Sequence, residues 1–220
     1  MLKKLNKSDV IIGLICILIF SLALNMYSLY KIEDYKYRIG QESYIRIQDI
    51  KQRNESNMEI LNKSIDSKNI RNEEILKLYK NYDLMSTDII ELWQQYSEYK
   101  DNSVTLLSKH IETDKIIQND INGKIKEYMY STLTKEMKNE KRKLILEDEN
   151  LKCFEAMEEM SERIYNYFNE FNSNKLNGCS EEEKQKKIIK NKYWIDMLSG
   201  IYGVSDDYAD IQWNINSEEN

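Results

Sequence analysis

Residue types that carry most enzymatic and metal chemistry are scarce in this sequence. His110 is the only histidine among 220 residues, so a catalytic triad or a histidine metal site has almost no material. The sequence has no glycine-rich phosphate loop, which excludes a P-loop nucleotide hydrolase. No two of the cysteines, Cys16, Cys153 and Cys179, have the CxxC spacing typical of a zinc site. A bridge between Cys153 and Cys179 is open to a chain in an oxidising compartment, with two reduced thiols as the simpler expectation.

One acidic run has the spacing of a metal-binding motif. The run is a DDxxD pattern formed by Asp206, Asp207 and Asp210, and paired carboxylates suit a hard cation such as Mg²⁺. The pattern is similar to the diphosphate-binding motif of all-helical isoprenoid synthases. A second, weaker resemblance, to the other metal motif of terpene cyclases, lies at Asn119, Asp120 and Glu127. Because Gly123 stands where that second motif needs a hydroxyl and the order of the motifs is reversed, we expect a solvated acidic turn. A Mg²⁺-dependent enzyme is the remote alternative, and we expect no catalytic residues, no metal and no cofactor.

Binding surfaces are better represented than reactive groups. A net charge of -6 argues against nonspecific nucleic-acid binding. A lysine-rich stretch lies within residues 184–192, which favours a solvated helix face, with contact to an anionic polymer or to lipid headgroups as the functional alternative. Aromatic residues concentrate near the C-terminus, where they either fill a core or anchor a partner. The candidate partner contact consists of Trp194, Tyr202, Tyr208 and Trp213.

Residues 10–30 form the most distinctive segment of the chain. They are about 21 consecutive residues without a charge, enough for a helix to cross a bilayer. Lys3, Lys4 and Lys7 precede the segment, and Tyr27 and Tyr30 stand where an interfacial aromatic belt would lie. We expect an uncleaved signal anchor.

A cleaved signal peptide and a lipoprotein signal are the alternatives for this segment. Ser21 and Ala23 fit a cleavage site loosely, but the apolar run continues past them. Cys16 lies in mid-segment, where a lipidated cysteine does not belong. The basic N-terminal tail favours a cytoplasmic N-terminus and an outside C-terminal domain, although Lys31 and Arg38 on the other flank weaken this bias.

The remaining sequence is typical of amphipathic helices. Proline is absent and 32% of the residues are charged, which suits long helices with solvated faces. Residues 31–68 are expected to form a helical stalk, interrupted near Asn54 and Asn57. The clearest pattern is a heptad-like seam over residues 75–99. The seam residues are Ile75, Leu78, Tyr82, Met85, Ile89, Leu92, Tyr96 and Tyr99.

Three further helices are expected after the seam. The first covers residues 104–145 and the second residues 146–174. The third begins at Ser180, which forms a capping box with Glu183, and ends near Gly200 and Gly203.

These elements predict an all-α protein with one N-terminal transmembrane helix, a stalk and an antiparallel helical bundle or coiled coil. The expected organisation is a basic tail at 1–9, the membrane helix at 10–30, the stalk at 31–68, the bundle at 69–204 and an acidic, aromatic tail at 205–220. Heavy use of Lys, Asn, Ile and Tyr is typical of AT-rich bacterial genomes. The outline is similar to that of bacterial division and envelope-assembly proteins.

The resulting hypothesis is a single-pass, non-enzymatic interaction or scaffold protein of a bacterial cell envelope. Its expected partners are the lipid bilayer and another protein or a second copy, and we favour seams that pack within one chain. A ligand-sensing bundle that acts through a partner is the alternative.

Overall fold

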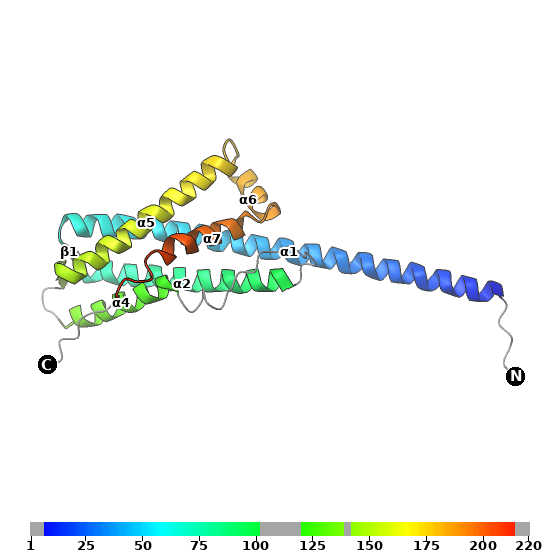
Figure 1. Cartoon of the computed structure of the whole chain (residues 1–220), viewed down its shortest axis with the longest axis horizontal. Helices are drawn as coiled ribbons and strands as arrows, with labels where there is room; N and C mark the ends of the chain where they lie inside the picture. The colour runs from blue at the N-terminus through cyan, green and yellow to red at the C-terminus, as the bar shows by residue number, and fades with distance from the viewer. Residues whose placement is uncertain (1–6, 102–119, 139–141, 214–220) are drawn as a thin grey trace. The chain divides into compact units, whose positions relative to one another are not determined.

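The computed structural model describes residues 7–101, 120–138 and 142–213 (Figure 1). It confirms the all-α fold, with a minor two-stranded β-ribbon added. The elements in chain order are α1 (Lys7–Asp66), β1 (Asn69–Arg71), α2 (Asn72–Asp101), α4 (Ile121–Glu136), β2 (Lys143–Ile145), α5 (Asp148–Lys175), α6 (Glu181–Lys190) and α7 (Tyr193–Asp206). The chain divides into two compact units, Met1–Ile39 and Gly40–Asn220.

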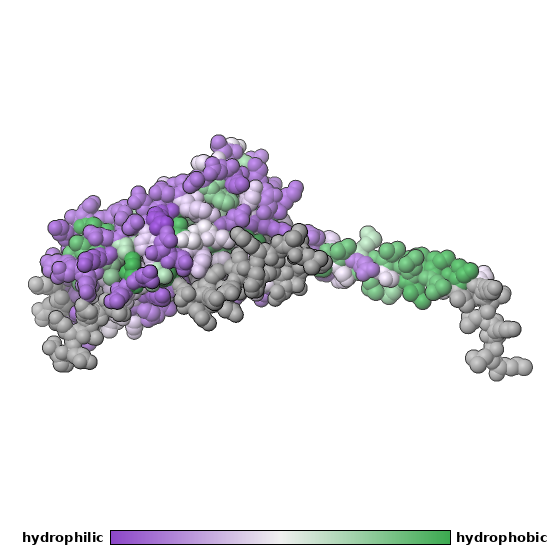
Figure 2. Space-filling model, in the orientation of Figure 1, coloured by the Kyte–Doolittle hydropathy of each residue, from purple (hydrophilic) through white to green (hydrophobic). Residues whose placement is uncertain are grey.

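The first unit contains the expected membrane helix. It is the one helix in the described part of the chain that is long and apolar enough to cross a membrane. From Ile11 to Tyr30 its large apolar side chains are between 51% and 72% exposed. Figure 2 shows this stretch as a continuous hydrophobic surface. Such a surface is costly in water and is satisfied in a hydrocarbon environment.

The expected stalk is the first correction to the domain boundaries. Residues from Gly40 onward belong to the second unit, and Ile47, Ile50 and Leu61 are fully buried in it. The second half of α1 is therefore a core helix of the bundle, and only residues 31–39 separate the apolar segment from that bundle in the sequence. Asn54 and Asn57 interrupt the apolar stripe of this segment, so the sequence indicated a stalk. In the structure both asparagine side chains are buried.

A polar layer inside the bundle explains these two asparagines. The Asn54 amide donates to the backbone carbonyl of Ser161 on α5 at 2.8 Å. The Asn81 amide on α2 donates to Asn57 Oδ1 at 2.7 Å. The layer thus joins α1 to both α5 and α2, and buried hydrogen bonds of this kind favour one register between helices.

Helices α1, α2 and α5 form three sides of the bundle. Helix α4 lies antiparallel to the first half of α2, since Tyr79 contacts Tyr130 with ring centroids 5.7 Å apart and Lys126 lies 3.6 Å from Asp83. Helix α7 covers the second half of α2. The fourth side is therefore shared by α4 and α7.

The heptad-like seam of α2 faces the interior. All eight seam residues are buried, and none is more than 8% exposed. One of them contacts α7: the Tyr99 ring meets the Trp194 ring edge-on, with centroids 6.2 Å apart. The seam therefore packs within one chain, and an intermolecular zipper has no free surface at these positions.

The expected helix over residues 104–145 is the second correction. Residues 104–119, including His110, lie outside the described residues; the helix α4 begins after its N-cap Asp120 and ends at Glu136. Residues 143–145 instead pair with β1 in an antiparallel ribbon, with Ile70 opposite Leu144. Lys68 and Arg142 adopt positive φ beside the two strands, and these turns break the helical pattern.

The last expected helix is interrupted in the middle. The Ser180 capping box is present and opens α6, as predicted. The chain then turns at Asn191 and Lys192, where Lys192 has φ 58°, and α7 begins at Tyr193. A left-handed backbone cannot continue an α-helix, so one stripe of apolar residues is divided between two helices.

Candidate functional site

The C-terminal aromatic residues fill the core of the bundle. Trp194 is 1% exposed, Tyr208 5% and Trp213 9%. Tyr202, which is partly exposed, meets Trp93 edge-on at 6.1 Å. The predicted partner contact therefore has little exposed surface at three of its four residues.

Residues 208–213 belong to this core and not to a free tail. The Trp213 ring lies 6.3 Å from Tyr128 on α4, and the Cys153 thiol on α5 contacts the Gln212 carbonyl at 3.8 Å. The Tyr208 ring stacks under the Arg163 guanidinium at 5.5 Å. The boundary predicted at residue 205 is thus too early, because the aromatic residues beyond it pack on α4 and α5.

The DDxxD carboxylates are not arranged as a metal site. Asp207 forms an ion pair with Arg163 at 2.5 Å, while Asp206 and Asp210 are exposed. Among the described residues no three His, Cys, Asp or Glu side chains come close enough to hold a metal ion. Asp120 of the weaker motif caps α4 by accepting from two backbone amides, and Asn119 lies outside the described residues.

The cysteines are free thiols. Cys153 lies near the start of α5 and Cys179 just beyond its end, so α5 separates them by about 33 Å at 1.5 Å per residue. A disulfide requires Cα atoms within about 7 Å. The bridge considered from the sequence is therefore incompatible with this fold.

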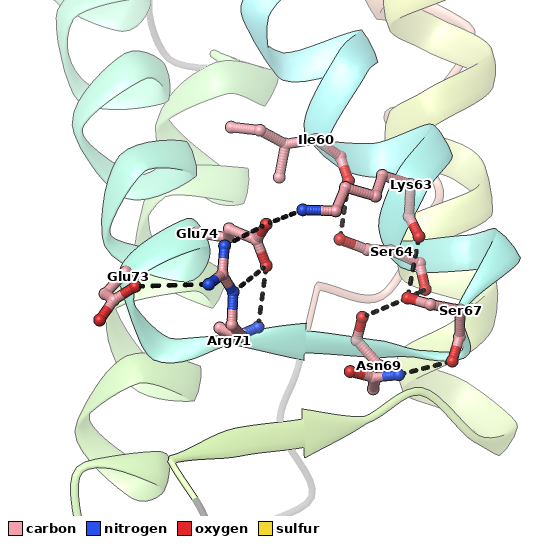
Figure 3. A network of polar contacts seen from close by, with 8 residues as sticks. All are labelled: Ile60, Lys63, Ser64, Ser67, Asn69, Arg71, Glu73 and Glu74. Atoms are coloured by element: carbon pink, nitrogen blue, oxygen red, sulfur yellow. Dashed lines mark hydrogen bonds and ion pairs between the residues drawn. The ribbon is translucent and has the colours of Figure 1, made fainter.

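An ionic network joins the end of α1 to the start of α2 (Figure 3). Glu74 accepts from the Arg71 guanidinium at 3.2 Å, from the Arg71 backbone amide at 3.1 Å and from Lys63 at 2.9 Å. These hydrogen bonds, those from Arg71 above all, lower the pKa of Glu74 to about 2. Glu74 thus pairs with both Lys63 and Arg71, and these contacts stabilise the turn between α1 and α2.

A cleft of about 130 Å³ lies at the other end of the bundle. It opens between α1, α5, α6 and α7, and we call it the α6 cleft. Its polar lining comprises Tyr44, Gln48, Lys51, Asn172, Glu181 and Lys184. Phe168, Leu176, Ile188 and Met197 lie behind this lining, but each is at most 4% exposed, so the accessible surface of the cleft is mainly polar.

The charged side chains of the α6 cleft form ion pairs with neighbouring residues. Lys184 donates to Glu181 at 2.6 Å, so these two groups satisfy each other. Lys51 forms an ion pair with Glu55 at 3.8 Å, and its charge also helps to lower the pKa of Glu181. Burial raises the pKa of the Tyr44 phenol, and the charge of Glu181 adds to the effect.

Close packing of α6 on α1 shapes one wall of this cleft. A Cβ atom at Gly40 would lie 2.9 Å from Ile189 Cγ2, so glycine permits the approach of the two helices. Sequence reasoning missed the cleft, because its lining comes from four helices that are distant in the chain. The local signals, a capping box and a lysine-rich stretch, indicated α6 but not what α6 covers.

A second surface feature lies near the β-ribbon, where apolar side chains remain exposed. Met137 is 73% exposed, Tyr130 53% and Leu76 38%. Tyr79, which contacts Tyr130, completes this group. We call these four residues the tip patch; they lie along the two packed helices α2 and α4.

Comparison of the chain with protein-family models, with curated protein sequences and with solved structures found no match.

Proposed function

We propose that this chain is a non-enzymatic, membrane-anchored interaction protein of a bacterial cell envelope, whose helical bundle binds another protein. The observation that carries the proposal is the uncovered apolar helix of residues 11–30, joined to a bundle that packs its own seams. A helix of this kind needs a bilayer. Because the seam residues are buried inside the bundle, a partner would bind to the outer surface of the bundle.

The tip patch replaces the C-terminal aromatics as the proposed contact. Aromatic and methionine side chains are enriched in protein interfaces. Exposed cations flank the patch: Lys80 on α2, Lys138 at the end of α4, and Arg142, whose carbonyl accepts from the Asn72 amide at 3.1 Å. An apolar surface with a basic rim complements a partner segment that is apolar and acidic.

For orientation, we propose a cytoplasmic N-terminus and an outside bundle. Lys3, Lys4 and Lys7 precede the membrane segment, and basic residues are retained on the cytoplasmic side. The bundle itself would then face the compartment in which envelope partners are found.

Site-specific photo-crosslinking tests the proposed contact in intact cells. A photoreactive phenylalanine analogue is introduced at Met137, and at the exposed Asn166 of α5 as the matched control. We expect an adduct of a distinct mass from position 137 only. Reversal of charge at Lys80 and Lys138 should weaken that adduct, because the basic rim attracts an acidic partner.

Three outcomes would contradict the proposal. Adducts of the same masses from both positions would show nonspecific proximity. No adduct from position 137 would leave the tip patch without a partner. An adduct at twice the chain mass would make the patch a contact between two copies of this chain.

Extraction of membranes at alkaline pH tests the anchor separately. The wild-type chain should remain with the membrane, since an apolar helix of this length spans the hydrocarbon layer. Leu18→Arg should reduce retention, because a charge at the centre of the span costs about 3 kcal/mol on insertion. Release of the wild-type chain into the soluble fraction would refute membrane anchoring.

A further inference from the structure

The two edges of the β-ribbon differ in how their backbone groups are used. In an antiparallel ribbon, residues of one kind of pair bond each other across the ribbon, and residues of the alternate pairs point their backbone groups outward. The Asn72 amide donates to the Arg142 carbonyl at 3.1 Å, and the register repeats such a bonded pair at every second position. The outward-pointing residues are therefore Asn69 and Arg71 on β1, and Lys143 and Ile145 on β2.

Side chains of this chain already occupy the outer edge of β1. The Ser67 hydroxyl donates to the Asn69 carbonyl at 3.0 Å, and the Arg71 amide donates to the Glu74 carboxylate at 3.1 Å. Figure 3 shows both contacts on the side of β1 that is turned away from β2. These side chains take the positions that an added strand would need.

The outer edge of β2 has no such cover within the described part of the chain. The outward N–H and C=O groups of Lys143 and Ile145 form no hydrogen bond with any described residue. Lys143 is exposed and Ile145 is 50% exposed. Two donors and two acceptors thus lie along one strand edge, and an unpaired edge of this kind is a template for another extended chain.

The charge of the ribbon favours an acidic partner. Arg71 stands directly opposite Lys143, and like charges at opposite positions destabilise a pair of strands. Arg71 pairs with Glu73 and Glu74, whereas Lys143 has no ion pair among the described residues. A carboxylate on an added strand would neutralise Lys143. A second copy of β2 would bring another lysine and no carboxylate.

We propose that the outer edge of β2 binds an extended acidic segment of a partner protein as a third, antiparallel strand. Two partner residues, separated by one residue, exchange backbone hydrogen bonds with Ile145 and then with Lys143. Their side chains lie on the same face of the ribbon as those of Ile145 and Lys143, so the first is apolar and the second acidic. Glu147, two residues after Ile145, disfavours a carboxylate at that end. The recognised pattern is apolar–x–acidic.

This inference rests on the proposed function, because it describes how the partner of the tip patch is held. The β-ribbon and the tip patch lie at the same end of the bundle. The Asn72 side-chain amide, directly after β1, donates to the Glu136 carbonyl at 3.3 Å, and Met137 of the tip patch is the next residue. One partner can therefore contact both surfaces.

Fluorescence anisotropy of a labelled peptide, titrated with the full-length chain in detergent, tests the mode of binding. The probe is Ser-Thr-Ile-Thr-Glu-Thr-Ser, and the control has its isoleucine and glutamate exchanged. N-methylation of the isoleucine or the glutamate removes an N–H that points to β2, so binding should weaken by about 10-fold. N-methylation of the threonine between them removes an N–H that points away, and should leave binding unchanged.

A charge exchange locates the peptide on β2. Lys143→Glu should weaken binding of the probe by about 5–10-fold, and should bind better a peptide with lysine in place of the glutamate. That second peptide also shows that the variant is folded. Lys77→Glu, at an exposed lysine of α2, is the matched control and should bind the probe like the wild type.

Four outcomes would overturn the added strand. The probe does not bind, or binds no better than the exchanged control peptide. N-methylation of the central threonine weakens binding as much as N-methylation of its neighbours. Lys143→Glu and Lys77→Glu have the same effect. A chain that is dimeric in solution and becomes monomeric with Lys143→Glu has a second copy at this edge.

The crosslinking at Met137 separates this inference from the proposed function. An adduct from position 137 together with a failure of the probe to bind would retain the tip patch as a contact and remove the added strand. Binding of the probe without an adduct would retain the strand and contradict the tip patch.

Discussion

Gly200 and Gly203 lie one turn apart on α7 but have different surroundings. A Cβ atom at Gly200 would overlap the Tyr167 ring of α5, whereas nothing lies within 4 Å of a Cβ at Gly203. Tyr167 is held in place by its hydroxyl, which donates to the Asp196 carbonyl at 2.8 Å. Glycine at position 200 is therefore required by the close approach of α5 and α7.

Gly200→Ala should destabilise the bundle by about 1–3 kcal/mol, because the ring must move from a packed position. Gly203→Ala is the matched control, and it should stabilise the protein by up to about 1 kcal/mol through helix propensity. Urea unfolding of the full-length chain in detergent, followed by circular dichroism, measures both. Equal effects of the two substitutions would contradict the packing of α5 on α7.

The pKa of Glu74 leads to a prediction on pH dependence. Because hydrogen bonds lower the folded-state pKa from 4.5 to about 2, the carboxylate stabilises the fold above pH 4.5. This stabilisation is lost as the pH falls from 4.5 towards 2. Solvent screening limits it to roughly 1 kcal/mol.

Glu74→Gln should therefore lower the free energy of unfolding by about 1 kcal/mol at pH 7, and its difference from the wild type should shrink towards pH 2. Glu73→Gln is the control, since the Glu73 side chain is 86% exposed and lies 3.9 Å from Arg71. Urea unfolding at a series of pH values provides the measurement. A constant difference over this range would show that Glu74 acts by packing and not by its charge.

At the scale of elements, the polar layer sets how α1 and α2 align. Asn57 and Asn81 are buried and hydrogen-bonded to each other. Replacement of one by leucine leaves the other amide buried with an unsatisfied group, at a cost of about 1–3 kcal/mol. Replacement of both removes the unsatisfied group.

We expect Asn57→Leu and Asn81→Leu each to destabilise the protein, and the double variant to be more stable than the sum of the single effects indicates. Chemical unfolding of the wild type, the two single variants and the double variant measures the coupling between the two residues. Additive effects would show that the two amides act independently. This result would contradict the inference that the polar layer selects the register between α1 and α2.

At the scale of the whole molecule, the thiols report the side of the membrane on which the bundle lies. Cys179 is half-exposed and Cys153 is 6% exposed. Burial also raises the pKa of the Cys153 thiol, so less of it is the reactive thiolate. A chain that retains only Cys179 should react with a membrane-impermeant maleimide in intact cells if the bundle is outside.

The chain that retains only Cys153 is the internal control, and it should react only after unfolding. Labelling of Cys179 that requires cell lysis would place the bundle in the cytoplasm. The orientation proposed from the basic N-terminal tail would then be wrong, while the anchor and the bundle would stand.

Several features could be read directly from the sequence. The apolar run at 10–30, the heptad-like spacing of Ile75 to Tyr99 and the Ser180 capping box all depend on residues within a few positions of each other. Helical geometry repeats every 3.6 residues, so such spacing specifies a helix and its buried face without knowledge of the rest of the chain. These features were sufficient to predict one helix that is long and apolar enough to span a membrane, the all-α class and the inward-facing seam.

Other features depend on residues that are far apart in the chain. Ile70 pairs with Leu144, Asn54 bonds Ser161, and the α6 cleft brings Tyr44 beside Lys184. Burial of Trp213 and the inclusion of Gly40–Asp66 in the bundle also depend on contacts between residues that are far apart in the chain. A polar residue in an apolar stripe indicates an interruption when only its neighbours are known, because its hydrogen-bond partner is supplied by another helix. The physical reason for the division is that local periodicity selects each helix, whereas burial and polar pairing are settled only when the helices pack.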